Sequence, residues 1–402
     1  MKVNLLGWCL GCLLLSAEAM PLSQVLTLAS TQHPTVKLKI SEAKTAGFDL
    51  NTAKWSRYPS LSSELSTDNS GSQRAILIQQ PVWTGGRVTA QINAATANEL
   101  LANYAIREAQ NAIMLQAAAS YFEFIRWESR LATAKQNEAE HLRLLELIDR
   151  RVKSEISPLA DRTLTAARYQ QAISERIQFT RSLDEARIAL ENAVGENVDK
   201  AVMPRGLNWL PKTDVEAFEL ALNYSAERQK MLQQIEVSQA QIEINKAAWQ
   251  PTVMVGFRRA AGSVPFGIDR DKAFVALQFT PGPGLSAKST VESAVSRLEN
   301  VRSSIAVHDK QLEYRVKSSV SELRALSAQV EPAKALSDAT IEVVDSYLRQ
   351  YQIARKNWLD VLNAQRERSQ ALYNLADTET NVAALNVRLM LLTGQLTPEN
   401  LQ

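Results

Sequence analysis

Cysteine is nearly absent from this sequence, and neither sign of charge is in clear excess. Only Cys9 and Cys12 occur, and both fall in what looks like an export signal, so we expect no disulfide and no cysteine-based metal site in the mature chain. The 45 basic residues nearly balance the 43 acidic ones, which gives no reason to expect a nucleic-acid partner. His33, His141 and His308 stand too far apart to form a metal-ligand pair. Because no nucleophile motif is present either, we expect no cofactor and no enzyme.

Glycine is missing from two long stretches, residues 87–194 and 285–393. Each stretch follows a glycine-rich turn, "TGGRV" or "PGPGL", and ends in a similar sequence, "ENAVGE" or "MLLTGQ". Upstream, "KWSRYPSLSSEL" is matched by "KAAWQPTVMVGF" about 190–200 residues later, the pattern expected of a duplicated unit. We therefore predict a first repeat over 20–201, a linker over 202–213, a second repeat over 214–395 and a tail over 396–402.

The N-terminus reads as a signal peptide over residues 1–19. Lys2 precedes an apolar segment, and "AEA" provides a cleavage site after Ala19. A retained membrane anchor is the weaker alternative, because the apolar run is shorter than about 20 residues. Lipidation of Cys12 is a further alternative, since "LGC" resembles part of a lipobox. No later segment is long and apolar enough to cross a membrane as a helix.

Each repeat reads as a helix, two strands, a very long helix and a shorter helix. The helices end at proline and glycine-rich positions, and the long ones show the three- and four-residue spacing of a coiled coil. Pro332 lies inside the second long helix and predicts a break or kink. The predicted helices are Thr35–Arg57, Val88–Lys153, Leu159–Val194, Ala226–Ala248, Ser286–Ala354 and Trp358–Leu392. The predicted strands are Pro59–Ser66, Ala75–Trp83, Pro251–Arg259 and Ala273–Phe279.

Helix length favours an elongated molecule over a compact bundle. The helix from Val88 to Lys153 would be roughly 100 Å long, and the two shorter helices of its repeat would together reach roughly 90 Å. Four strands leave exposed edges that a membrane does not tolerate, whereas three copies would give a closed twelve-stranded barrel. Four aromatic residues at strand–helix junctions would then form an interfacial girdle. They are Trp55, Tyr58, Trp83 and Trp249.

The duplicated unit, together with "QPVWTGGRVTAQ" and "YQIARKNWLDVLNAQ", resembles the TolC family of outer-membrane exit ducts over essentially the whole mature chain. The resemblance implies a mainly α protein with a small β part. It would be a homotrimer, with a β-barrel surrounded by outer-membrane lipid and an α-helical barrel that crosses the periplasm of a Gram-negative bacterium. It also implies a periplasmic adaptor protein and an inner-membrane pump, of either the ABC or the proton-driven kind, as partners.

The resemblance also implies functional positions. Tyr351 and Lys356 match the residues that close the periplasmic gate of the family, and Asp360 and Asn363 match its two constricting acidic residues. Because Asn363 is neutral, we expect weaker cation binding at the entrance. Asp360 is equally well explained as a carboxylate that stabilises the start of its helix. Adaptor docking in the family uses a Val-Gly-Leu-like triplet at each hairpin tip. The matching residues are Ser154, Glu155 and Ile156 in the first hairpin and Ile353, Ala354 and Arg355 in the second.

Strand-to-helix bends are expected at two pairs of glycines, which can adopt backbone conformations closed to other residues. They are Gly85 with Gly86, and Gly282 with Gly284. The second pair begins "GPGLSAKST", which resembles a phosphate-binding loop only in part, because Ala287 replaces the glycine that precedes the lysine. A passive export duct is thus the leading hypothesis, and "WLDVLNAQ" inclines it to type I secretion of an adhesin or toxin. Multidrug or metal efflux is the alternative cargo, and a periplasmic adaptor or a non-membrane coiled-coil protein is the alternative class.

Overall fold

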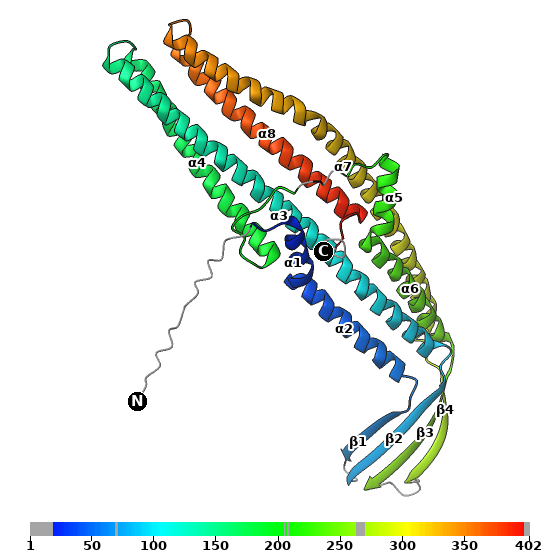
Figure 1. The fold of residues 1–402 in the computed structure, drawn as a ribbon. Helices are drawn as coiled ribbons and strands as arrows, with labels where there is room; N and C mark the ends of the chain where they lie inside the picture. The colour runs from blue at the N-terminus through cyan, green and yellow to red at the C-terminus, as the bar shows by residue number, and fades with distance from the viewer. Residues whose placement is uncertain (1–18, 69–70, 205, 207–208, 263–269, 398–402) are drawn as a thin grey trace, which may run out of the picture.

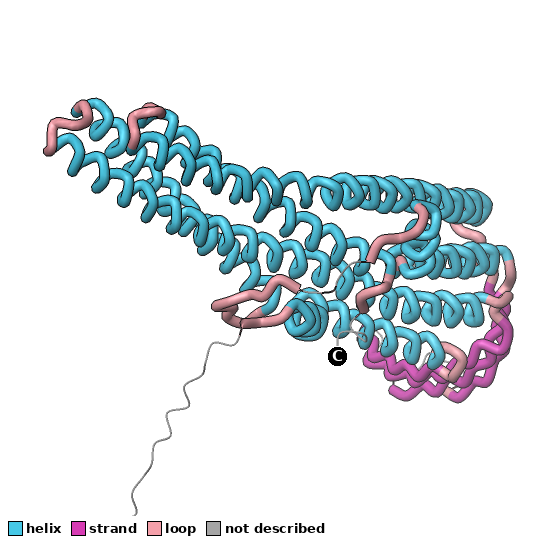
Figure 2. The backbone as a smooth tube through the Cα atoms, turned by 45° about the horizontal axis from the view of Figure 1, so that its top comes forward, coloured by secondary structure: helices cyan, strands magenta, loops and turns pink. Residues whose placement is uncertain are grey.

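A computed structural model describes residues 19–68, 71–204, 206, 209–262 and 270–397. Long helices form most of the molecule, and a four-stranded sheet lies at one end of them (Figure 1). Two helical hairpins form the opposite end (Figure 2). Most of the expected signal peptide, including Cys12, lies outside the described residues. Within the described part, no helix is long and apolar enough to cross a membrane.

The two repeats have the same order of elements. The first comprises α1 (Leu22–Gln32), α2 (Pro34–Trp55), β1 (Ser60–Asp68), β2 (Gly71–Trp83), α3 (Arg87–Lys153) and α4 (Leu159–Val194). The second comprises α5 (Asp214–Tyr224), α6 (Ala226–Lys246), β3 (Thr252–Gly262), β4 (Asp271–Gln278), α7 (Ala287–Gln352) and α8 (Trp358–Thr393). Short 3₁₀ turns, Ala247–Trp249 and Pro283–Leu285, lie on either side of the second strand pair.

Helices α2 and α4 both pack along α3, and Figure 1 shows them following one another along its length. In the second repeat α6 and α8 pack along α7 in the same manner. The shorter helices therefore cover the long one from end to end, as their lengths predicted. The glycine-free composition of α3 and α7 suits such long helices, because glycine within a helix costs about 1 kcal/mol relative to alanine.

Two features differ from the expectation. Each repeat begins with a short helix, α1 or α5, that the sequence pattern did not reveal. Helix α1 is separated from α2 only by His33, whose side chain caps the next helix, and α5 is separated from α6 only by Ser225. The second difference is at Pro332, where a break or a kink was expected: α7 continues through this residue, so no break occurs. Figure 1 shows α7 as a curved helix rather than a broken one.

The largest apolar core lies where α1, α3 and α4 meet near the middle of the molecule. Tyr121 of α3 is fully buried there, and its hydroxyl donates to the carbonyl of Val202 at 2.7 Å and accepts from the Val202 amide at 3.0 Å. Burial raises the pKa of the Tyr121 hydroxyl. The start of the predicted linker is thus tied to the long helix of the first repeat.

Candidate functional site

The sheet has one apolar face. Its strands are antiparallel in the order β1-β2-β3-β4, and residues paired across strands lie on the same side. One row across the sheet joins Leu61, Ile78 and Phe257, and another joins Val255 to Val275. All five of these side chains are exposed in the single chain, as are Leu65 and Leu277 on the same face. Exposed apolar side chains in such number indicate an apolar environment outside this chain.

The opposite face carries mainly small and polar side chains. One row joins Ser60, Gln79, Gly256 and Phe274, and the ring of Phe274 covers the glycine, whose absent Cβ would lie 2.5 Å from it. The next row contains Ser62, Leu77, Arg258 and Lys272. Alternation of an apolar and a polar face along every strand is the pattern of a membrane sheet that surrounds water.

The predicted aromatic residues lie where the sheet joins the helices. Trp55 ends α2, Trp83 ends β2 and Trp249 ends the short turn after α6. The ring of Tyr58 lies 5.1 Å from that of Trp55. All four side chains are exposed, which fits a place at a membrane surface, although their role there stays a prediction.

The four predicted bend glycines lie in the connections from strand to helix, and all have positive φ. At Gly85 (φ 60°) a Cβ would also lie 2.2 Å from the Cβ of Gln250, so the two repeats approach each other too closely there for any side chain. At Gly282 (φ 83°) a Cβ would meet the hydroxyl of Ser286.

At the other end of the molecule, Tyr351 lies between the two helical hairpins. Its side chain is buried, and its hydroxyl lies 2.9 Å from Oγ of Ser157, in the loop between α3 and α4. Arg151 of α3 donates to the same Ser157 oxygen at 3.2 Å, and its guanidinium lies 4.8 Å from the centre of the Tyr351 ring. The predicted gate tyrosine therefore joins the second hairpin to the first.

Trp358, the first residue of α8, makes a second connection that the sequence reasoning missed. Its ring packs 4.8 Å from that of Tyr351, and its Nε1–H donates to Oγ1 of Thr165 in α4 at 2.6 Å. Both partners are buried, and the Thr165 hydroxyl donates onward to the carbonyl of Asp161. The tryptophan is part of the quoted "WLDVLNAQ", but its partner lies in the other repeat and could not be read from the motif.

Helices α3 and α8 continue this contact away from the tips. Asn137 accepts hydrogen bonds from Ser369 at 2.7 Å and from Gln365 at 3.2 Å, and all three side chains are buried. Further along, Arg130 forms an ion pair with Asp377. The two hairpins of one chain are thus joined by polar groups over much of their length.

The remaining predicted gate residues lie close to the tip. Asp360 accepts a hydrogen bond from the amide of Asn357 at 3.3 Å, as part of a capping box, and lies 3.9 Å from Nζ of Lys356. Lys356 also lies 4.3 Å from the ring centre of Tyr347. Asn363 is half-buried one turn further along α8. Asp360 is therefore engaged by its own helix and by Lys356, which supports the helix-capping interpretation and leaves its part in a constriction a prediction.

The two hairpin tips have the same backbone turn. The amide of Ile156 donates to the carbonyl of Arg151 at 2.9 Å, and that of Arg355 donates to Gln350 at the same distance. The preceding residues, Glu155 and Ala354, adopt the left-handed conformation, with φ of 60° and 59°. These are the middle residues of the two predicted docking triplets, where the family pattern has glycine, so the backbone keeps a glycine-like turn without the glycine.

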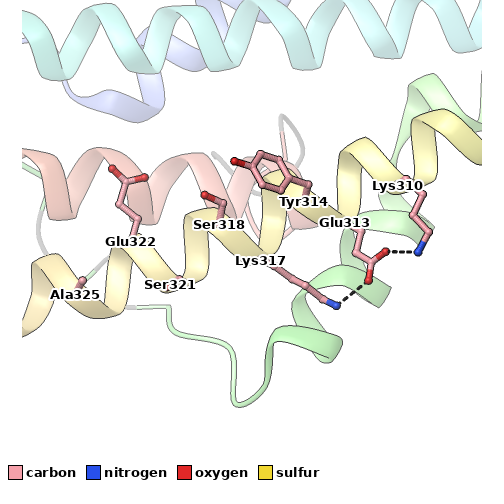
Figure 3. Close-up of a pocket in the computed structure, with 8 residues that line it drawn as sticks. All are labelled: Lys310, Glu313, Tyr314, Lys317, Ser318, Ser321, Glu322 and Ala325. Atoms are coloured by element: carbon pink, nitrogen blue, oxygen red, sulfur yellow. Dashed lines mark hydrogen bonds and ion pairs between the residues drawn. The ribbon is translucent and has the colours of Figure 1, made fainter.

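No group of histidine, cysteine and carboxylate side chains in the described part could hold a metal ion. One open hollow lies along a single face of α7 and contains Glu313 between Lys310 and Lys317 (Figure 3). Hydrogen bonds from Lys317 and Lys310 lower the pKa of Glu313 to about 2. Because these residues come from one helix and pair with each other, the hollow has no arrangement suited to a reaction.

These features define a class of protein: a duplicated helical-hairpin molecule whose sheet, at one end, has one apolar and one polar face. Residues 45–196 match the family model described as "Outer membrane efflux protein". No curated protein sequence matches the chain. Among solved structures, CusC has a TM-score of 0.81 at 14% identity, covering 92% of this chain and 91% of its own.

Two further solved structures are similar over nearly their whole length. The outer membrane protein VceC of Vibrio cholerae has a TM-score of 0.78 at 17% identity, covering 93% of this chain and 96% of its own. The MtrE outer membrane channel of Neisseria gonorrhoeae has a TM-score of 0.75 at 15% identity, covering 93% and 88%. The match to the efflux-protein model is confined to residues 45–196, whereas the likeness to these outer-membrane channels is one of fold and extends over more than nine-tenths of the chain.

Proposed function

We propose that three copies of this chain form the passive outer-membrane duct of a three-part exporter. The observation that carries the proposal is the sheet with one apolar and one polar face, whose outer strands β1 and β4 have no further partner among the described residues. Unpaired strand edges are not stable in lipid, and pairing β4 of one copy with β1 of the next satisfies them. Three copies then supply an even number of strands within the known range for such barrels.

The internal repeat supports a ring and indicates where the next copy binds. Glu155 and Ala354 are 199 residues apart, and so are the helix-ending glycines Gly195 and Gly394. Every helical position in the first hairpin therefore has an equivalent position 199 residues later in the second, and we call two such residues twins. Within one chain α8 packs against α3, and the twin of this contact would pair α4 with the α7 of another copy.

Exposure of the twin residues agrees with that pairing. Trp358 of α8 is 2% exposed, whereas its twin Leu159 in α4 is 64% exposed. On the other side of the contact, Asn137 of α3 is 8% exposed, whereas its twin Leu336 in α7 is 54% exposed. The same contrast holds for Val387 with Ile188 and for Leu144 with Val343. Helices α4 and α7 lie on opposite flanks of the chain, as a closed ring requires (Figure 1).

The hairpin tips are the proposed entrance and adaptor-docking site. Ile156, Leu159, Ile353 and Leu359 expose aliphatic side chains around the two left-handed turns, and such side chains suit a protein partner. In the proposed duct, the polar contacts of Tyr351 and Trp358 hold the two hairpins of each chain together and thereby keep the entrance closed. The structure of MtrE is of an open state, which gives a precedent for opening in this fold.

The cargo is proposed more specifically from sequence. The motif "WLDVLNAQ" favours type I protein secretion, for example of an adhesin or toxin, with an ABC pump. The family description as an efflux protein favours small solutes such as drugs or metal ions, with either kind of pump. The two cargoes differ in what accumulates inside the cell when the duct is missing.

A complementation experiment tests the ring and the cargo together. A strain that lacks the protein receives the wild type, Leu336→Glu or Ala335→Glu. Leu336 is exposed with a buried twin, whereas the adjacent Ala335 and its twin Gln136 are both exposed, so Ala335→Glu is the matched control. We expect the wild type and Ala335→Glu to form heat-modifiable trimers and to restore export, and Leu336→Glu to do neither.

The readouts are trimer content on gels, the proteins secreted into the medium, and susceptibility to drugs and metal ions. Loss of a secreted protein with unchanged susceptibility supports secretion, and the reverse result supports efflux and rejects secretion. A Leu336→Glu protein that assembles and exports like the control would contradict the proposed ring.

A further inference from the structure

The polar face of the sheet holds two like charges directly opposite each other. Arg258 of β3 is paired in register with Lys272 of β4, and both side chains are exposed. Like charges in this position destabilise a sheet. Among the described residues, no ion pair includes either side chain. The carboxylates on the same face of β1 are Glu64 and Asp68, which lie one row and three rows further along.

The adjacent pair on the other face shows the usual arrangement. Arg259 is opposite Asp271, and the two side chains form an ion pair of 3.6 Å between Nε and Oδ1. The same two strands thus pair opposite charges on the apolar face, whereas the adjacent pair on the polar face brings two positive charges together. A negatively charged solute in the lumen would offset the repulsion between Arg258 and Lys272.

We propose that Arg258 and Lys272 form a cationic belt inside the outer-membrane barrel that favours anionic solutes over cationic ones. The proposal rests on the proposed function, because only a closed barrel places this face around water. The row contains Ser62, Leu77, Arg258 and Lys272, so each of the three copies contributes two cations and no carboxylate to it. Rings of lysine and arginine give pores a preference for anions. Lys272 follows the first residue of β4, so the belt lies in the half of the sheet remote from the helices (Figure 1).

The mature chain offers a direct test because it is expected to contain no cysteine. Ser62 lies in the same row as Arg258 and Lys272, and Ser63 lies on the opposite face. Single cysteines are introduced at each position, and the protein in outer-membrane vesicles is treated with an anionic or a cationic methanethiosulfonate. Neighbouring strands are about 4.8 Å apart, so Ser62 lies about 10 Å from Arg258, close to one Debye length in 0.1 M salt.

For the Ser62→Cys thiol we measure the ratio of the rate with the anionic reagent to the rate with the cationic reagent. We expect this ratio to be at least about three times the ratio for a free thiol. The preference should disappear in about 1 M salt, where the Debye length is about 3 Å. It should also disappear when Arg258→Gln and Lys272→Gln are added. Arg259→Gln is the control, and it should leave the preference unchanged because Arg259 lies on the outer face.

The outcomes separate the belt from the barrel. If the Ser62→Cys thiol reacts readily but equally with both reagents, or if the double glutamine variant keeps the preference, the belt is wrong and the barrel stands. If the Ser63→Cys thiol is as reactive toward both charged reagents as the Ser62→Cys thiol, the apolar face is not in lipid and the proposed function itself fails.

Discussion

The contact between Trp358 and Thr165 gives a quantitative prediction about the entrance. Thr165→Val keeps the shape of the side chain and removes the acceptor of the indole N–H, which is 2.6 Å away in a site where both residues are buried. An unpaired buried donor costs about 1–3 kcal/mol. When the hairpins separate, water can bond the indole, so the cost falls on the closed state alone. About 1.4 kcal/mol corresponds to a tenfold change in an equilibrium.

We therefore expect Thr165→Val to raise the ratio of open to closed entrances by about tenfold for each copy. Single-channel recording of the purified protein in planar bilayers measures this ratio. Thr163→Val is the matched control, since Thr163 is exposed on the same helix and its hydroxyl bonds the carbonyl of Leu159. Trp358→Phe should act in the same direction, and the two changes together should be less than additive because they remove the same bond.

The result that would refute this reasoning is an open probability for Thr165→Val equal to that of Thr163→Val in a fully folded trimer. Additive effects of Thr165→Val and Trp358→Phe would also refute it, because the two side chains would then act independently. Circular dichroism and trimer content serve to show that folding is intact in each variant.

Two further predictions concern stability and are read from thermal unfolding. Ala354→Gly and Glu155→Gly should each raise the free energy of unfolding by about 1 kcal/mol, because glycine adopts the left-handed conformation without the steric cost that other residues incur. Arg355→Gly is the control and should not raise it. A lower Tm in both tip variants would contradict this prediction. His141 is buried in α3, where desolvation, and to a lesser extent the charge of Arg168, lower its pKa below the usual 6.5. As the pH falls below 6.5, His141 therefore takes up a proton more readily in the unfolded than in the folded state, which favours unfolding. The stability of the wild type should therefore fall between pH 7 and 5 more steeply than that of His141→Gln, and parallel pH profiles would contradict the assignment.

Helix limits could be read from the sequence where a strong local signal fixes them. The predicted and observed bounds of α4 agree, because Pro158 precedes its start and Gly195 follows its end. The starts of α2 and α6 were predicted close to Pro34 and Ser225, but the preceding helices α1 and α5 were missed, because each has only 11 residues in which to show a helical periodicity. The uninterrupted helix at Pro332 shows that packing along a long helix can outweigh a missing backbone hydrogen bond.

Site residues could be predicted only as far as each motif reached. The sequence placed Tyr351 and the two tips correctly at one end of the molecule, because they adjoin the breaks between helices. It did not indicate Ser157 or Thr165 as partners of Tyr351 and Trp358, since these lie in the other repeat and meet them only after the hairpins pack. Likewise the Arg258–Lys272 pair depends on the register of two strands, which residue types alone do not fix.

The repeat also implies that the proposed ring has two unequal kinds of junction at its entrance. Within a chain, Trp358 forms a hydrogen bond with Thr165, and Tyr351 forms one with Ser157. In the equivalent junction between copies, Leu159 takes the place of Trp358 and Val152 that of Tyr351. Ala364 takes the place of Thr165 and Lys356 that of Ser157. An aliphatic side chain cannot replace a buried hydrogen bond, so the polar contacts that hold the entrance closed are concentrated within each chain. Opening should therefore depend chiefly on releasing α8 from the first hairpin of its own chain, the step that Thr165→Val is designed to weaken.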